Sequence, residues 1–215
     1  MKIPFIIAVL FQASSLAAQT ETPAKTYTVH INTVDSLVKA EVYYLNPDIK
    51  PRKGHFYCWY TPEKLSTTEA GFNGKLLHGE YVCSYPGKNM KEQGKYVNGL
   101  KDGTWKKWYS NGVVMETSSW KDGEKDGSIV LFGPTGQKVL EAGYKNGKLH
   151  GEVISYQDGT GKTIKKYKNG EEVQQSTTKE KENVTGDKPP KEPWLKRLFG
   201  KKKKSGTTDG KSTNT

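Results

Sequence analysis

Hydrophobic and polar residues alternate along much of this chain, and short turn signals interrupt the alternation at regular intervals. In one stretch, Thr104 to Tyr109 is rich in β-forming residues, Ser-Asn-Gly at 110–112 is a turn sequence, and Val113 to Trp120 is a second β-forming run. Nine Asn-Gly or Asp-Gly pairs occur between residues 73 and 170, and such pairs supply the positive φ that tight hairpin turns require. The pattern predicts a series of β-hairpins.

The hairpins repeat with a period of about 24 residues. Five glycines are spaced by 25, 24, 24 and 24 residues: Gly54, Gly79, Gly103, Gly127 and Gly151. Two residues after each stands Phe56, Tyr81, Trp105, Ile129 or Val153, and seven before the last four stands Phe72, Tyr96, Trp120 or Tyr144. A fixed period of this length indicates a repeat architecture. We therefore predict an all-β protein, an elongated single-layer antiparallel sheet of tandem hairpin repeats over residues 54–173.

Aromatic side chains fall on both faces of the predicted sheet, because successive residues of a strand point to opposite sides. One interpretation is structural, since cross-strand aromatic pairs stabilise a thin sheet. The other is a binding surface for an apolar or glycan partner. The residues of that candidate binding face are Trp59, Tyr81, Tyr85, Trp105, Trp108, Tyr109 and Trp120.

Two stretches carry a resemblance to a known family. Tyr-Lys-Asn-Gly-Lys-Leu-His-Gly-Glu at 144–152 and Gly-Thr-Trp-Lys-Lys-Trp-Tyr-Ser-Asn-Gly at 103–112 resemble the MORN repeat (membrane occupation and recognition nexus). They are most similar to the bacterial variant often labelled YwqK-type antitoxin. The resemblance implies a scaffold or adaptor, for which lipid binding has been proposed. Residues 19–53 also alternate like strands, and we expect them to cap the N-terminal end of the array.

The first 18 residues are typical of a secretory signal peptide: Lys2, an apolar run from Ile3 to Phe11, and small residues ending at Ala18. A buried N-terminal strand is the alternative. The apolar run is shorter than the ~20 residues that a spanning helix needs, and no other stretch of the chain could cross a membrane. No cysteine lies near the cleavage site. We expect an exported protein of the periplasm or cell envelope, without a lipid anchor or a transmembrane helix.

The two cysteines hold the same place in adjacent units, since Cys58 and Cys83 each follow a repeat glycine by four residues. Equivalent strands of a hairpin meander lie two strands apart, or ~9.6 Å at ~4.8 Å per strand. A disulfide needs Cα atoms within about 7 Å. We therefore predict two buried, reduced cysteines.

No motif in the chain points to catalysis. The four histidines are His30, His55, His78 and His150, and none has metal-ligand spacing. His78 and His150 stand directly before a repeat glycine, where Asp102 and Asp126 stand in other units, so we interpret this position as structural. No Gly-x-Ser-x-Gly elbow occurs. We expect no enzymatic activity, no cofactor and no metal.

The charge of the chain is concentrated near its C-terminus. The 215 residues carry a formal net charge of +11, and seven Lys or Arg against one Glu lie between Pro189 and Ser205. Residues 174–192 have the composition of a disordered linker, and 205–215 that of a disordered tail. Between them, 193–204 is a short basic amphipathic segment whose candidate membrane contacts are Trp194, Leu195, Lys196, Arg197, Leu198, Phe199, Lys201, Lys202, Lys203 and Lys204.

Three interpretations of this tail remain open: contact with an anionic membrane, a solvated solubility tail, or a site for an acidic protein or nucleic acid. Nucleic acid is disfavoured, because the folded part carries little of the positive charge. Together the patterns predict an exported, MORN-like scaffold with an unknown protein or lipid partner and peripheral membrane contact. The alternatives are a glycan-binding module and a toxin-neutralising protein partner.

Overall fold

The computed structural model describes residues 24–62, 64–157 and 161–173. The predicted signal peptide, the linker and the basic segment with its candidate membrane contacts lie outside these residues. The described residues contain thirteen β-strands and no helix. The strands are β1 (Thr26–Asn32), β2 (Leu37–Tyr43), β3 (Phe56–Thr61), β4 (Lys64–Glu69), β5 (Lys75–Ser84), β6 (Met90–Val97), β7 (Leu100–Trp108), β8 (Val114–Lys121), β9 (Glu124–Phe132), β10 (Lys138–Lys145), β11 (Lys148–Gln157), β12 (Gly161–Lys168) and β13 (Glu171–Val173).

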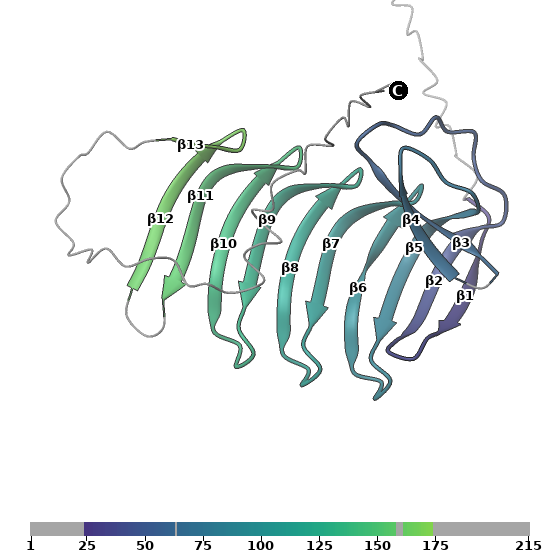
Figure 1. Ribbon diagram of the computed structural model, residues 1–215, viewed down its shortest axis with the longest axis horizontal. Helices are drawn as coiled ribbons and strands as arrows, with labels where there is room; N and C mark the ends of the chain where they lie inside the picture. The colour runs from purple at the N-terminus through teal and green to yellow at the C-terminus, as the bar shows by residue number, and fades with distance from the viewer. Residues whose placement is uncertain (1–23, 63, 158–160, 174–215) are drawn as a thin grey trace, which may run out of the picture. The chain divides into compact units, whose positions relative to one another are not determined.

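Eleven of the strands form one continuous row in the order β1-β2-β5-β6-β7-β8-β9-β10-β11-β12-β13, and each pairs antiparallel with its neighbours. Figure 1 shows these strands side by side, and from β5 to β11 successive strands are joined by hairpins. The prediction of an open antiparallel sheet of tandem hairpins is confirmed. No helix long and apolar enough to cross a bilayer occurs in the part of the chain that the structure describes.

The turns at the two ends of the strands, here called the two edges of the sheet, are of different types, and both types follow from the sequence. Along one edge, each hairpin closes through two residues that both have positive φ: Asn98 and Gly99 (52° and 78°), Asp122 and Gly123 (50° and 81°), Asn146 and Gly147 (48° and 73°), Asn169 and Gly170 (53° and 89°). This is the type I′ geometry that matches the twist of the strands. Along the other edge, three-residue loops such as 110–112 are closed by a bond from the Gly112 N–H to the Tyr109 carbonyl (3.0 Å).

The last four repeat glycines do not lie in turns, contrary to what the Asp-Gly pairs at 102–103 and 126–127 suggest. They lie inside β5, β7, β9 and β11, where three residues of the strand oppose one residue of the preceding strand. In these bulges Gly79, Gly103, Gly127 and Gly151 have φ of 114°, 69°, 104° and 91°. Each is the middle one of the three bulge residues except Gly103, which is the first. Across the following strand they face Tyr96, Trp120, Tyr144 and Tyr167. A glycine is required because other residues rarely adopt this φ.

The first expected unit, which begins at Gly54, does not take a place in the row. Its hairpin β3–β4 branches off, and β3 pairs with the start of β5 through Trp59 and Leu76. The place next to β5 belongs instead to β2, whose Val42 and Ala40 are almost completely buried. Two cores result. The larger contains Val42, Cys58, Leu77, Tyr81, Cys83, Tyr96 and Trp105, and the smaller contains Tyr43, Tyr57, Trp59, Leu76 and Leu100.

Candidate functional site

Three of the seven residues of the candidate binding face are buried. Trp105 is 1% exposed, and its indole lies 4.9 Å from the Tyr96 ring and 5.6 Å from the Tyr81 ring, centroid to centroid. Tyr81 and Tyr96 also meet edge to face at 5.5 Å. Edge-to-face and tilted ring contacts of this kind commonly stabilise an aromatic core. Trp105 and Tyr81 therefore belong to the interior and offer a partner almost no surface.

Trp59 lies in the other core, on the branched hairpin. Its indole nitrogen donates to the Thr68 hydroxyl (2.8 Å), and the side chain is 8% exposed. Trp108 is half-buried, and because it lies three positions after Trp105 on β7, the two side chains point to opposite faces of the sheet. The structure therefore does not bring the seven residues together as one surface.

Tyr85 and Tyr109 have a structural role at the edge with the three-residue loops. The Tyr85 hydroxyl donates to the Trp108 carbonyl (3.0 Å), and the Tyr109 hydroxyl donates to the Phe132 carbonyl (2.9 Å). The side-chain amides of Asn89 and Asn111 likewise donate to backbone carbonyls of the next loop, those of residues 110 and 134. These side chains tie each loop to the next, and the two tyrosines hold the same repeat position, 24 residues apart.

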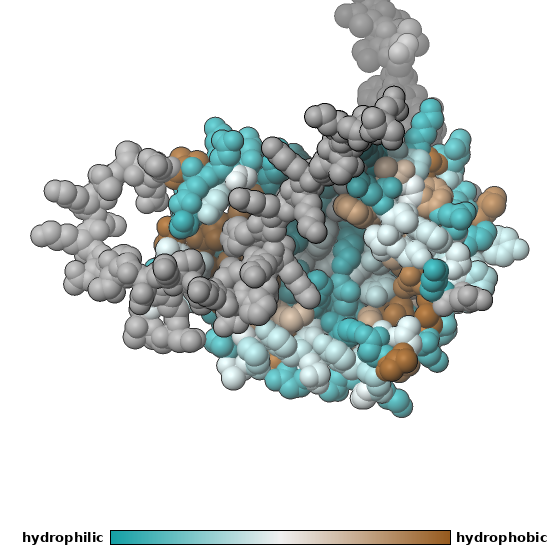
Figure 2. Space-filling model, in the orientation of Figure 1, coloured by the Kyte–Doolittle hydropathy of each residue, from teal (hydrophilic) through white to brown (hydrophobic). Residues whose placement is uncertain are grey.

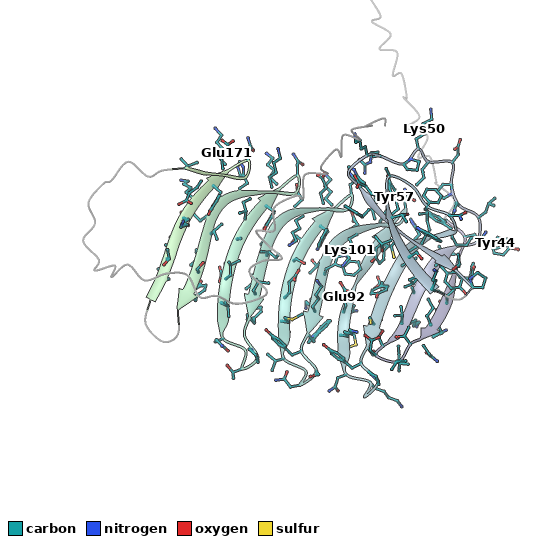
Figure 3. The ribbon with its side chains drawn as sticks, viewed as in Figure 1. Tyr44, Lys50, Tyr57, Glu92, Lys101 and Glu171 are labelled. Atoms are coloured by element: carbon teal, nitrogen blue, oxygen red, sulfur yellow. The ribbon has the colours of Figure 1, made fainter. Side chains whose placement is uncertain are left out.

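A second set of side chains accompanies the aromatic rings on β6 to β10, and its charged members were not singled out from the sequence. We call it the charged aromatic row: Glu92, Lys101, Trp105, Lys107, Glu116, Ser118, Trp120, Lys125 and Tyr144. The Lys101 ammonium bonds the Glu92 carboxylate (2.6 Å) and lies 3.7 Å from the centre of the Trp105 ring. Figure 3 labels Glu92 and Lys101 on neighbouring strands near the middle of the sheet. Burial lowers the pKa of Lys101, an effect that Glu92 opposes.

The row continues through Trp120. Its indole nitrogen donates to the Ser118 hydroxyl (2.9 Å), which donates to the Glu116 carboxylate (2.9 Å). Glu116 also pairs with Lys107 (3.5 Å). Ser118 is 3% exposed, so its two hydrogen bonds supply the partners that a buried hydroxyl requires.

Lys125 holds the place of Lys101 in the next repeat, 24 residues on, but its surroundings differ. Its ammonium lies 5.8 Å from the Trp120 ring centre and 5.2 Å from that of Tyr144. Glu116, the counterpart of Glu92, bonds Lys107 and Ser118 instead, so among the described ion pairs none includes Lys125. Burial lowers the pKa of Lys125. The 24-residue spacing of Lys101 from Lys125, and of Glu92 from Glu116, is the signal that could have revealed this row from the sequence.

On the described part of the face seen in Figure 2, hydrophobic side chains do not merge into one large surface. Figure 2 shows hydrophilic residues over most of the visible described face, with hydrophobic residues in separate patches. Exposed large hydrophobic residues include Tyr44, Leu45 and Phe56 near the N-terminal hairpins and Ile164 on β12. The charged aromatic row, apart from its buried members Trp105 and Ser118, is half-buried and is therefore the most organised candidate for a binding face among the described residues.

Both cysteines are buried and unpaired, as predicted. The reason differs from the one expected, because Cys58 lies on the branched hairpin and not two strands from Cys83 within the row. Burial raises the pKa of both thiols. They are 6% and 5% exposed and line the larger core together with Tyr81 and Tyr96.

At three of the repeat glycines, the preceding residue accepts a hydrogen bond from the next turn. The Asp102 carboxylate accepts the Asp122 N–H (3.4 Å), and the Asp126 carboxylate accepts the Asn146 N–H (3.0 Å), so each caps the first residue of the next type I′ turn. The His78 ring does the same for Asn98 through Nδ1 (3.3 Å).

At His150, the buried Nδ1 has no hydrogen-bond partner. The following strand, β12, pairs with β11 in an unbroken register, without the extra residue that interrupts the registers of β6, β8 and β10. The last turn is therefore one residue closer in sequence to its repeat glycine than the others. Within the described ranges, no group of three or more His, Cys, Asp or Glu side chains is placed to hold a metal ion.

Two comparisons with known proteins found no match for this chain. A scan against protein-family models found no family that matches it. A search of curated proteins found no match either.

Proposed function

We propose that this chain is a non-enzymatic scaffold of the MORN type that is exported, works in the cell envelope and binds a protein or lipid partner. The observation that carries the proposal is the charged aromatic row, which runs across β6 to β10 with its ionic groups only half-buried. A row perpendicular to the strands gives an extended partner a repeated set of contacts, as in other repeat proteins. The resemblance to the MORN repeat at 103–112 and 144–152 supports the same function.

The membrane part of the proposal concerns residues 193–204, which lie outside the described residues. Their six Lys and Arg at 196–204 would each contribute about 1 kcal/mol next to an anionic surface. Trp194, Leu195, Leu198 and Phe199 would share one face of a short helix and enter the interface. Reversible, salt-sensitive binding is the expected behaviour.

Co-sedimentation with vesicles tests the membrane contact. The mature chain is compared with a variant in which Lys201 to Lys204 are changed to Gln, on anionic and on neutral vesicles, at low and high salt. We expect the unchanged chain alone to sediment with anionic vesicles, and high salt to weaken it. Equal recovery of both proteins, or equal binding to neutral vesicles, would refute the membrane contact.

Cross-linking in intact cells tests the partner. A chain with Lys125→Gln should lose a cross-linked partner that the unchanged chain captures, whereas Lys145→Gln, an exposed lysine at a turn, should retain it. If both variants capture the partner equally, the row is not the binding face. A partner that copurifies in a fixed stoichiometric ratio would favour the toxin-neutralising alternative.

A glycan-binding module remains the second candidate, but the burial of Trp59 and Trp105 weakens it, because a sugar platform needs an open ring face. Trp108 and Trp120 are the half-buried tryptophans left for it. Loss of glycan binding on changing both to Leu, with the fold retained, would support this alternative.

A further inference from the structure

The turn Asn98–Gly99 differs from the other type I′ turns because the branched hairpin rests on it. The Gly99 carbonyl accepts the Cys58 N–H of β3 (2.7 Å), and the Gly99 N–H donates to the Leu77 carbonyl of β5 (2.7 Å). Gly99 is also tightly enclosed, since a methyl group in its place would lie 2.6 Å from Leu76. The position of this turn therefore decides how β3 sits on the sheet.

Two aromatic side chains hold the turn from the side of the sheet. The Tyr43 hydroxyl donates to the Asn98 side-chain oxygen (2.6 Å), and the Asn98 N–H donates to Nδ1 of His78 (3.3 Å). The rings of Tyr43 and His78 stack on each other, with centroids 4.4 Å apart and planes 29° apart. Three residues from β2, β5 and the turn thus form a closed set of contacts.

The bond to Asn98 requires a neutral imidazole. An imidazole nitrogen accepts a hydrogen bond only when it carries no proton, and protonation makes both ring nitrogens donors. A proton on Nδ1 would point at the Asn98 N–H, and the turn would lose its cap. The caps of the next two turns, Asp102 and Asp126, are carboxylates, which accept in their ionised form.

We propose that His78 is a pH-sensitive latch that fastens the β6–β7 turn, and through it the β3–β4 hairpin, to the sheet at neutral pH and loosens both under mild acid. The loosened hairpin is the one that contributes Cys58 to the larger core, beside Tyr81, Tyr96 and Trp105. Acid would therefore open the edge of that aromatic cluster to solvent. The inference stands apart from the proposed partner and membrane contact and does not depend on either.

The groups around His78 act in opposite directions. Burial and, to a lesser extent, the Lys95 ammonium of β6 disfavour the imidazolium, while the Glu41 carboxylate of β2 favours it, and the pKa of His78 is lowered on balance. Stacking on Tyr43 would also favour a cation. Because the folded pKa lies below the unfolded value of 6.5, the unfolded ring binds the proton more readily. The latch is therefore fully closed above pH 6.5 and weakens as the pH falls toward the lower folded value.

Amide hydrogen exchange of the full mature chain tests the latch. Protection factors of the Cys58, Asn98 and Gly99 amides are measured from pH 7.5 to pH 5 and corrected for the intrinsic exchange rate. Below pH 6.5 we expect them to fall by up to about tenfold per pH unit, until the folded pKa is reached. The corresponding amide of the next turn, Gly123, should not follow, because Asp102 caps that turn.

The repeat supplies the matched control. His78→Asp installs the cap that two other repeats use, and it should keep the three protection factors flat to about pH 5, since aspartate remains ionised there. His78→Asn, which cannot titrate, is the second variant if the first fails to fold. His30→Asn changes an exposed histidine on β1 and should leave the pH dependence intact.

Three results would overturn the proposal. The first is an equal loss of protection in the unchanged chain and in both His78 variants. The second is a rise in protection on acidification, which would mean that stacking of the imidazolium on Tyr43 outweighs the lost bond. The third is an NMR titration of the folded chain in which the pKa of His78 is not below the ordinary value of 6.5.

Discussion

Gly94 lies directly beneath the Trp105 indole. Changing Gly94 to alanine should destabilise the protein, although it adds only one methyl group. A methyl group at this position would meet three atoms of the indole, the farthest of them, Cγ, at only 2.7 Å. Gly94 does not have positive φ, so the effect comes from crowding rather than from the backbone. The mutation thus isolates how rigidly Trp105 is held.

Trp105 has little room to move away. Its indole nitrogen donates to the Lys95 carbonyl (3.2 Å), the rings of Tyr81 and Tyr96 flank it, and the Lys101 ammonium lies over it. Overpacking of a well-packed core costs about 1–3 kcal/mol. Alanine also makes the unfolded chain less flexible than glycine does, which raises the free energy of unfolding by about 0.4–1 kcal/mol. We therefore expect Gly94→Ala to lower the free energy of unfolding by about 1 kcal/mol at the middle of these ranges and by up to about 2.5 kcal/mol.

Urea denaturation followed by tryptophan fluorescence measures this change, and the matched control is Gly87→Ala. Gly87 also lacks positive φ, and no atom lies within 4 Å of the place its methyl group would take. The control should be neutral or stabilised by up to about 1 kcal/mol. If the two variants have the same free energy of unfolding within about 0.5 kcal/mol, Trp105 is not held as described.

Three further predictions follow from the buried groups. Lys101→Met should lower the free energy of unfolding by about 1–3 kcal/mol, because it leaves the Glu92 carboxylate partly buried without its partner. Adding Glu92→Gln should restore part of this loss in urea denaturation. If the effects of the two substitutions are fully additive, the pairing is contradicted. Cys58 and Cys83 should resist a thiol reagent at pH 8 in the folded chain and react fully in denaturant. The reason is that burial raises the pKa of both thiols and blocks access of the reagent. Rapid labelling of the native chain would count against this prediction. Burial also raises the pKa of Tyr81 and Tyr96, so the folded state disfavours their phenolates. The free energy of unfolding should therefore fall as the pH rises above 10. An ultraviolet titration in which every tyrosine ionises near pH 10 before the chain unfolds would refute this prediction.

The hairpins and their turns could be predicted from the sequence because their causes are local. The pairs at 98–99, 122–123, 146–147 and 169–170 carry the residue types that positive φ requires, and the strands alternate as expected. The same local rule failed at 102–103 and 126–127, because the dipeptide does not specify whether positive φ serves a turn or a bulge. That choice depends on the neighbouring strand, which supplies one residue against three.

The tertiary structure alone decided which segment lies beside β5 and which aromatic residues are buried. The unit at Gly54 matches the repeat in sequence, yet β2 takes its place in the row, since Ala40 and Val42 pair with Tyr81 and Leu77 and are buried there. That competition is between distant segments, and periodicity cannot rank them. The burial of Trp59 and Trp105, and the pairing of Lys101 with Glu92 but not of Lys125 with Glu116, depend on the same contacts. The sequence thus determined the repeating unit, whereas packing between units determined which of its side chains remain available to a partner.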